Sequence, residues 1–278
     1  WQQLEPVAPF PFPWGFFRFF DTFPECAHLD PPPLKPVAFG PDARFDLAIL
    51  AYQVWFLSPS LPTTAFLQSP AARVLRDTPV ITFIVCRNMW LSAQEKVKKL
   101  LAGLGARLID NVVLTDQGPP WSTFVTTPLW LLTGRKDALP GIFPPAGVSE
   151  ADIAGAARFG RALADRLVLL KSIAGPLLPG LGAVKVQPGY IAGEKIAHRS
   201  FLLWGRLLRA VGKPGGFLRR TVLVVYIAFL VTMILTVMPV SVAVRAFLRP
   251  VLRKRLDAEV ARLEAPSGSS TERLAQYQ

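Results

Sequence analysis

The chain has 278 residues, which is long enough for one ordinary domain and an appendage. Its hydrophobic fraction of 51% and mean hydropathy of +0.35 are high for a purely soluble protein. The only two cysteines, Cys26 and Cys86, are far apart and form no C-x-x-C pair, so their spacing offers neither a disulfide framework nor a zinc site.

The first elements of residues 1–172 alternate between strand and helix signals. Trp1–Glu5 reads as the end of a strand, and the stretch Pro6–Pro36, rich in proline and aromatic residues, follows it. Phe45–Ala51 (FDLAILA) is an apolar run of strand length, typical of a parallel strand buried on both faces. Pro62–Arg76 then has the apolar spacing of a helix.

Further along, Pro79–Cys86 (PVITFIVC) and Ala106–Thr115 (ARLIDNVVLT) are two more predicted strands. Between them, an S-x-x-E capping box at Ser92 predicts a helix that ends near Leu104. A similar S-x-x-D signal at Ser149 predicts a long helix to about residue 170. This alternation indicates an α/β fold with a parallel sheet and helices on both faces.

One long insertion, Gln117–Gly147, separates the last predicted strand from the last predicted helix. Loops of this length often form lids or substrate walls, and irregular packing over the sheet is an equal alternative.

Few side chains suggest independent chemistry. Asp110 and Asn111 interrupt an apolar strand and predict a bulge or an edge. Cys86 ends a strand and is interpreted as inert packing. His28 and His198, the only histidines, have no context typical of a catalytic triad, and no acidic cluster suggests a metal.

The basic charge surrounds one hydrophobic segment. Residues 199–262 hold 12 of the lysines and arginines against two acidic residues, a net charge of +10. Residues 173–220 form a basic amphipathic region, and Thr221–Val244 follows with 24 uncharged residues. This length predicts a membrane helix, and the placement of charge favours anionic lipid head groups over nucleic acid. The remaining residues, 245–278, are basic and then polar, and we expect disorder after Leu263.

The orientation of this segment stays open, because five basic residues flank each end. It either spans the membrane once or lies partly inserted with both flanks on one leaflet. The stretch 201–208 (FLLWGRLL) predicts an interfacial lead-in, with Trp204 at head-group depth.

A family resemblance appears at Phe45–Leu67, which reads FDLAILAYQVWFLSPSLPTTAFL. This segment resembles the flavodoxin-like superfamily, in which a hydrophobic strand ends in a loop beside a flavin ring. Together with CRNMWLSAQEKVKKLL from Cys86 and GARLIDNVVL after it, residues 1–170 resemble the dialkylresorcinol condensing enzymes of aryl-polyene and dialkylresorcinol pathways. The resemblance implies a flavodoxin-like, doubly wound parallel sheet.

The resemblance also implies an FMN site at the carboxyl ends of the strands, where doubly wound sheets bind ligands. Trp55 is the first candidate to stack on the flavin ring, and backbone N–H groups of Arg87–Met89 would meet its pyrimidine edge. The alternative, that these aromatic residues only pack over the end of the sheet and bind no flavin, stays open. The candidate cofactor-binding residues are Tyr52, Trp55, Arg87, Asn88, Met89 and Trp90.

One departure from the family pattern concerns the phosphate loop. A flavodoxin-like fold begins with a strand and a Ser/Thr-rich turn that holds the FMN phosphate at a helix N-terminus. Trp1–Leu4 aligns with the second strand of that fold. We therefore expect the first strand, the phosphate loop and the first helix, roughly 35 to 40 residues, upstream of Trp1. Without them the chain would hold FMN poorly.

Two functions follow. The first is a membrane-associated, flavin-dependent oxidoreductase that acts on an apolar aryl or alkyl-cyclic intermediate of dialkylresorcinol or aryl-polyene lipid biosynthesis, with an apolar pocket from Phe10–Phe23 and Trp121–Trp130. The second is a non-catalytic flavodoxin-like scaffold that docks pathway enzymes at the membrane, since no nucleophile with a base is recognisable. Both place the main domain on the cytoplasmic side of a bacterial inner membrane.

Overall fold

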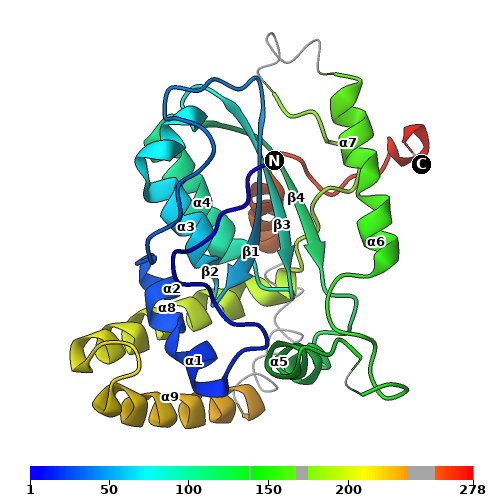
Figure 1. Ribbon diagram of the computed structural model, residues 1–278. Helices are drawn as coiled ribbons and strands as arrows, with labels where there is room; N and C mark the ends of the chain where they lie inside the picture. Colours follow the sequence, from blue (N-terminus) through cyan, green and yellow to red (C-terminus); the bar gives the residue numbers. More distant parts are fainter. Residues whose placement is uncertain (138, 167–174, 237–253, 278) are drawn as a thin grey trace.

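The computed structural model describes residues 1–137, 139–166, 175–236 and 254–277 (Figure 1). Its centre is a four-stranded sheet in the order β2-β1-β3-β4. Strands β1, β3 and β4 are parallel, and the short β2 pairs antiparallel with β1. The α/β class with a mostly parallel sheet is therefore confirmed. The strands are β1 (Ala48–Trp55), β2 (Ser58–Pro59), β3 (Pro79–Cys86) and β4 (Arg107–Thr115).

The central strands lie close to their predicted positions. β3 has the predicted bounds, and β4 begins one residue late. β1 begins at Ala48 and runs on to Trp55, so residues 52–55 belong to a strand and not to the expected loop. Trp1–Glu5 is not a strand. Its neighbour Pro6 makes an isolated antiparallel bridge with Leu34.

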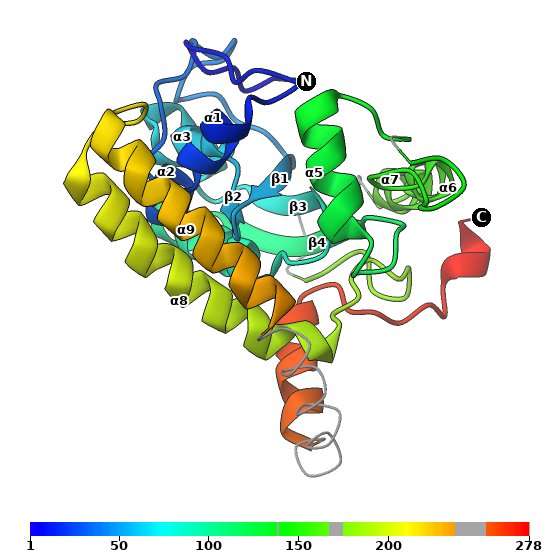
Figure 2. The same cartoon turned by 90° about the horizontal axis from the view of Figure 1, so that it is seen from below.

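Helices cover both faces of the sheet (Figures 1 and 2). On one face, α4 packs Val97 and Leu101 into the main core, and on the other α7 contributes Phe159. The predicted helix over 62–76 is divided into an α-helix and a 3-10 helix, and the one predicted from Ser149 into α6 and α7. The helices with both ends in the described residues are α1 (Phe16–Asp21), α2 (Phe23–His28), α3 (Leu61–Gln68), η1 (Pro70–Leu75), α4 (Leu91–Leu104), α5 (Thr123–Thr133), α6 (Glu150–Gly155), α7 (Ala157–Ala164), α8 (Pro188–Val211), α9 (Phe217–Leu235) and η3 (Leu274–Gln276). Residues 254–264 are helical as well.

The two predicted caps differ in outcome. The Ser149 hydroxyl accepts a hydrogen bond from the backbone N–H of Asp152 (3.0 Å), as the sequence signal predicts. The prediction that Ser92 is the N-cap is wrong, because α4 already begins at Leu91 and Trp90 is its N-cap. The backbone N–H of Ser92 donates to the carboxylate of Glu194 on α8 (2.5 Å). A residue 102 positions away in the sequence therefore caps this helix.

A second, smaller core joins α1, α2, α8 and α9 into a helical layer. Its buried members are Phe23, Leu208, Leu223 and Tyr226. The half-buried Trp204 packs against Phe229 with ring centroids 5.3 Å apart, and its predicted place at head-group depth stays a prediction. The expected juxtamembrane region is thus part of the folded body, and α9 lies along α8 (Figure 2).

Helices α2 and α8 approach each other closely at Gly205. A Cβ atom at this position would lie 3.0 Å from the His28 ring, so a larger side chain would fit only if that ring moved. The imidazole Nε2 of His28 lies 3.2 Å from the Leu202 carbonyl at the same crossing. Close contact of this kind fixes the position of α8 over α2.

The C-terminal tail is ordered where the structure describes it, so the expectation of disorder after Leu263 is wrong. The Ser267 hydroxyl donates to the Asp110 carboxylate (2.7 Å) and accepts from the backbone N–H of Asn111 (2.8 Å). Asp110 also accepts from the backbone N–H of Leu177 (2.7 Å). The predicted bulge at Asp110 is confirmed, since the register of β4 against β3 shifts there. This polar pair binds the tail to the sheet.

Candidate functional site

The carboxyl ends of β1, β3 and β4 point toward the end of the molecule where α1, α5 and α9 lie (Figure 1). In doubly wound α/β sheets this edge is the usual place for a ligand. All six predicted cofactor-binding residues lie on or next to these strands, but the structure places them in four different environments.

Trp55 lies at the end of β1 under the N-terminal aromatic segment. Phe10 and Trp14 pack against its ring at right angles, with centroids 5.1 and 5.6 Å away. Its indole N–H donates to the side-chain oxygen of Gln53 (3.1 Å). Aromatic neighbours and a hydrogen-bond partner therefore already occupy this ring.

Tyr52 belongs to the main core. It is 5% exposed, and its hydroxyl donates to the side-chain oxygen of Gln94 on α4 (2.7 Å). The Gln94 amide in turn donates to the Thr82 hydroxyl on β3 (2.9 Å). Burial raises the pKa of Tyr52 well above its usual value. This chain of hydrogen bonds ties α4 to the sheet, and Trp90, 3% exposed, is buried beside it in the same core.

Arg87 connects the loop after β3 to α5. Its Nε–H donates to the Thr123 hydroxyl (2.7 Å), and its guanidinium carbon lies 3.9 Å from the centre of the Phe124 ring. Burial lowers the pKa of Arg87 to about 10. The insertion Gln117–Gly147, which contains α5, is thus a wall beside this edge, in contact with a predicted site residue.

Asp116 joins the two ends of the insertion Gln117–Gly147. Its carboxylate oxygens accept hydrogen bonds from the backbone N–H of Gly118 (2.7 Å) and of Gly147 (2.6 Å). The backbone N–H of Gln117 donates to the Gly147 carbonyl (3.0 Å). One side chain therefore holds both ends of the insertion together, as in a compact loop with close ends.

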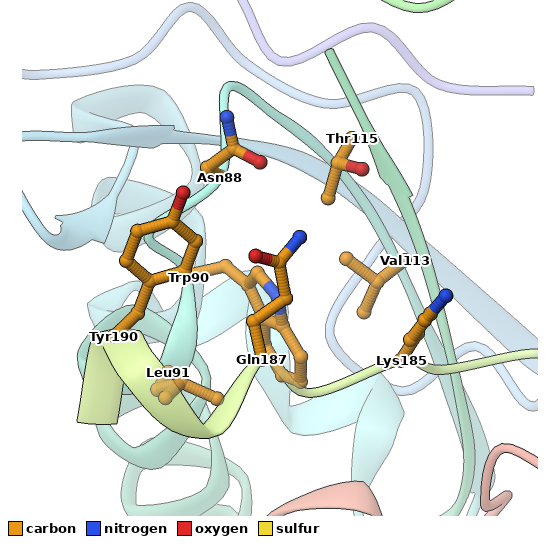
Figure 3. A pocket seen from close by; sticks show the side chains of 8 residues that line it. All are labelled: Asn88, Trp90, Leu91, Val113, Thr115, Lys185, Gln187 and Tyr190. Carbon is orange, nitrogen blue, oxygen red and sulfur yellow. The ribbon is translucent and has the colours of Figure 1, made fainter. Parts of the chain in front are cut away.

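Asn88 lines a small pocket of about 60 Å³ beside the N-terminus of α4 (Figure 3). Its amide Nδ2 is buried and has no hydrogen-bond partner among the described residues. Met89, the next predicted site residue, is half-buried in the same loop. The other residues around the pocket are Trp90, Leu91, Val113, Thr115, Lys185, Gln187 and Tyr190.

Sequence reasoning missed the contribution of residues 185–194 to this site. Glu194 is 1% exposed; one of its oxygens caps α4, and the other has no hydrogen-bond partner in the described part of the chain. Burial raises the pKa of Glu194. Burial, and then the nearby carboxyls of Glu194 and Asp116, raise the pKa of the Cys86 thiol, which keeps it protonated. The sequence did contain one sign that Glu194 has a structural role, because it is the only acidic residue among the 24 residues of α8.

The turn after β1 has an unusual backbone. Phe56 and Leu57 have positive φ angles of 48° and 58°, and Trp55 pairs with Ser58 across this two-residue hairpin. Glycine and asparagine are the residues that normally occupy such turns. Here side-chain packing holds the strained backbone, since Leu57 is buried and Phe56 contacts Phe23, with centroids 6.0 Å apart.

This arrangement does not fit an isoalloxazine ring. Ligand pockets for molecules of that size typically enclose about 300 Å³ or more, whereas the pocket at Asn88 is about 60 Å³. Tyr52 and Trp90 are buried, and Trp55 has two aromatic neighbours. Among the described residues, no group of three or more His, Cys, Asp or Glu side chains could hold a metal ion.

Comparison with known proteins adds no relative. No protein-family model, no curated protein and no solved structure matches this chain. The resemblance to flavodoxin-like proteins and to dialkylresorcinol condensing enzymes therefore remains a prediction from sequence, and the structure establishes the α/β class.

Proposed function

We propose that this chain is a membrane-associated α/β scaffold that holds the carboxyl-end edge of its sheet at a lipid surface. There it docks enzymes of dialkylresorcinol or aryl-polyene lipid biosynthesis, the pathways of the proteins that the sequence resembles. The observation that supports a non-catalytic role is the closed state of the edge, where Phe10 and Trp14 pack on Trp55.

The helical layer supplies the membrane part of the proposal. Within the described residues, α9 is one helix of 19 residues with a mean hydropathy of 2.0, which is long and apolar enough to cross a membrane, and only 17% of it is buried. It lies at the same end of the molecule as the carboxyl ends of the strands (Figure 1). Under this proposal, an enzyme bound at the lipid surface would meet this edge.

A second candidate function is the flavin-dependent oxidoreductase, with FMN as cofactor and an apolar aryl or alkyl-cyclic substrate. The unpartnered amide of Asn88 favours it, because the loop Arg87–Trp90 carries a buried donor at the edge where a ligand is expected. This function requires Phe10 and Trp14 to leave the ring of Trp55.

Flavin binding separates the two candidates. The full chain is purified in detergent, FMN is added, and the visible spectrum and flavin fluorescence are measured. The scaffold predicts a colourless protein that leaves FMN fluorescence unchanged. Saturable quenching of FMN that is lost in Trp55→Ala, and kept in the control Trp1→Ala, contradicts the scaffold and supports the oxidoreductase. Trp1 is a suitable control because its side chain is fully exposed and belongs to neither the sheet edge nor the insertion.

A further inference from the structure

The two chain segments that flank the hydrophobic region return to the same α/β domain. From this we infer that α9 binds an anionic lipid bilayer from one side, lying in the plane of its surface, and does not span it. The inference rests on the membrane association in the proposed function and specifies its geometry.

The segment before α9 is fixed to the domain by α8. The carboxylate of Glu194 on α8 caps α4 through the backbone N–H of Ser92. The same helix crosses α2 at Gly205 in close contact. Residues up to the start of α9 are therefore on the domain's side of any membrane.

The segment after it is fixed to the same body. Arg262 forms an ion pair with Glu95 on α4 (3.1 Å), and Glu264 accepts a hydrogen bond from the backbone N–H of Val186 (3.0 Å). Lys195 of α8 also pairs directly with Glu259. A single crossing between residues 216 and 254 would put these two flanks on opposite sides of the bilayer. The contacts put them on one side.

The inner face of α9 is occupied by protein for most of its length. Arg219, Leu223 and Tyr226 are buried against α1, α2 and α8, and the contact continues to Leu230. At 1.5 Å per residue this contact covers about 17 Å of a helix about 28 Å long. A spanning helix would carry this face, with the ion pairs of Arg219 to Asp21 and Glu25, into lipid.

The outer face of α9 is apolar and exposed. Phe217, Val225 and Leu235 are 87%, 56% and 70% exposed, and Val224 and Val231 lie on the same face. Exposure of so many apolar side chains on one helix face marks an interaction surface. The two threonines of this face, Thr221 and Thr232, donate their hydroxyls to carbonyls one turn back, so neither needs water.

The positive charge of the residues next to α9 favours a lipid partner over a protein partner. Residues 199–220, which include the start of α9, contain six basic and no acidic residues. Arg209 and Arg219 form ion pairs with acidic residues of α1, α2 and the loop after α2. The other four, Arg199, Arg206, Lys213 and Arg220, are exposed. Arg220, at the start of the helix, is exposed and lies over the Phe17 ring of α1, with its guanidinium carbon 4.1 Å from the ring centre. Basic residues around an apolar helix face are typical of helices that lie in the interface of anionic membranes.

The depth of α9 in a bilayer tests this geometry. Single cysteines replace Thr221, Ala228 and Leu235 in a Cys26→Ala/Cys86→Ala background, and each carries a nitroxide label. The full chain is bound to vesicles of phosphatidylglycerol and phosphatidylcholine, and the accessibility of the label to oxygen and to a water-soluble relaxation agent gives its depth. A label at Ile153, exposed on α6, is the control that stays in water.

We expect the three labels to lie at one shallow depth. Depths that change by about 1.5 Å per residue between positions 221 and 235 would show a spanning helix and overturn the inference, while membrane association would stand. If the full chain binds neither anionic nor neutral vesicles, the membrane part of the proposed function fails together with the inference.

A charge substitution identifies the surface. Val224→Glu/Val231→Glu on the outer face should weaken vesicle binding by about tenfold or more. The matched control Ile49→Glu/Ile153→Glu changes exposed apolar residues of β1 and α6 and should leave binding unchanged. The assignment would be overturned if the unsubstituted chain forms a dimer without lipid, the outer-face variant is monomeric, and both variants bind vesicles equally well. The outer face of α9 would then contact a second copy of the chain.

Discussion

Arg219 offers the sharpest test of how α9 is held. Its guanidinium is 1% exposed and donates to the Asp21 carboxylate (2.6 Å) and to both oxygens of Glu25 (2.9 and 2.7 Å). It also donates to the backbone carbonyl of Asp21 (2.7 Å). Arg219→Met keeps the aliphatic length and removes every one of these bonds. Two carboxylates in a mostly apolar site then lose their counter-charge.

The expected cost follows from that loss. Removing one partner of a buried ion pair typically costs about 3 to 5 kcal/mol, because the remaining charge stays desolvated. The side chains of Asp21 and Glu25 are 14% and 18% exposed, so water relieves part of the penalty. We therefore expect a loss near the lower end, about 3 kcal/mol in the free energy of unfolding.

Urea unfolding of the full chain in detergent, followed by tryptophan fluorescence, measures this loss. Arg220→Met is the matched control, because Arg220 is exposed and its contact with the Phe17 ring is worth about 0.5 to 1 kcal/mol. Adding Asp21→Asn and Glu25→Gln to Arg219→Met should recover part of the stability. A loss below about 1 kcal/mol, or one equal to that of Arg220→Met, would refute the assignment of Arg219 as the anchor of α9.

Three further predictions concern the α/β domain. Gln94→Leu should lower the free energy of unfolding in urea by about 1 to 3 kcal/mol, because the buried hydroxyls of Tyr52 and Thr82 lose their hydrogen-bond partner. An unchanged free energy would show that the two hydroxyls bond to water or to each other in the variant. Burial lowers the pKa of Lys96 from 10.5 to about 8, so the unfolded chain binds more protons between these values. Stability should then rise with pH across that window, by at most about 3 kcal/mol, and this rise should be absent in Lys96→Met. Asp110→Ala should release the C-terminal tail from β4, and hydrogen exchange of the amide groups of residues 177 and 267 should increase by at least tenfold; unchanged protection would contradict the role of Asp110.

The sheet was the part of the fold that local sequence could predict. Pro79–Cys86 is a continuous apolar run and Ala106–Thr115 is an apolar run interrupted only by Asp110 and Asn111 after its first residues, a pattern typical of strands covered on both faces. The Ser149 cap forms within four residues, and the bulge at Asp110 is indicated by polar residues in an apolar strand. Each of these features depends on neighbours close in the sequence.

The features that sequence reasoning missed depend on distant partners. The S-x-x-E pattern at Ser92 fails because Glu194, which approaches in space, supplies a better-placed carboxylate. Trp55 looked like a free stacking surface, but the aromatic segment 10–14 packs on it. The tail after Leu263 has a polar composition, and its order comes from Asp110, more than 150 residues earlier. Composition and periodicity carry no information on such contacts.

The contact between Phe56 and Phe23 links the turn after Trp55 to the packing of α9. Phe23 also packs against Tyr226 of α9, with ring centroids 4.4 Å apart, and Phe56 is the residue after Trp55. A ligand that must move Phe56 to reach Trp55 therefore disturbs the packing that seats α9. By thermodynamic reciprocity, lipid bound to α9 should raise the free-energy cost of admitting that ligand, so that the membrane itself acts as a negative effector of the site.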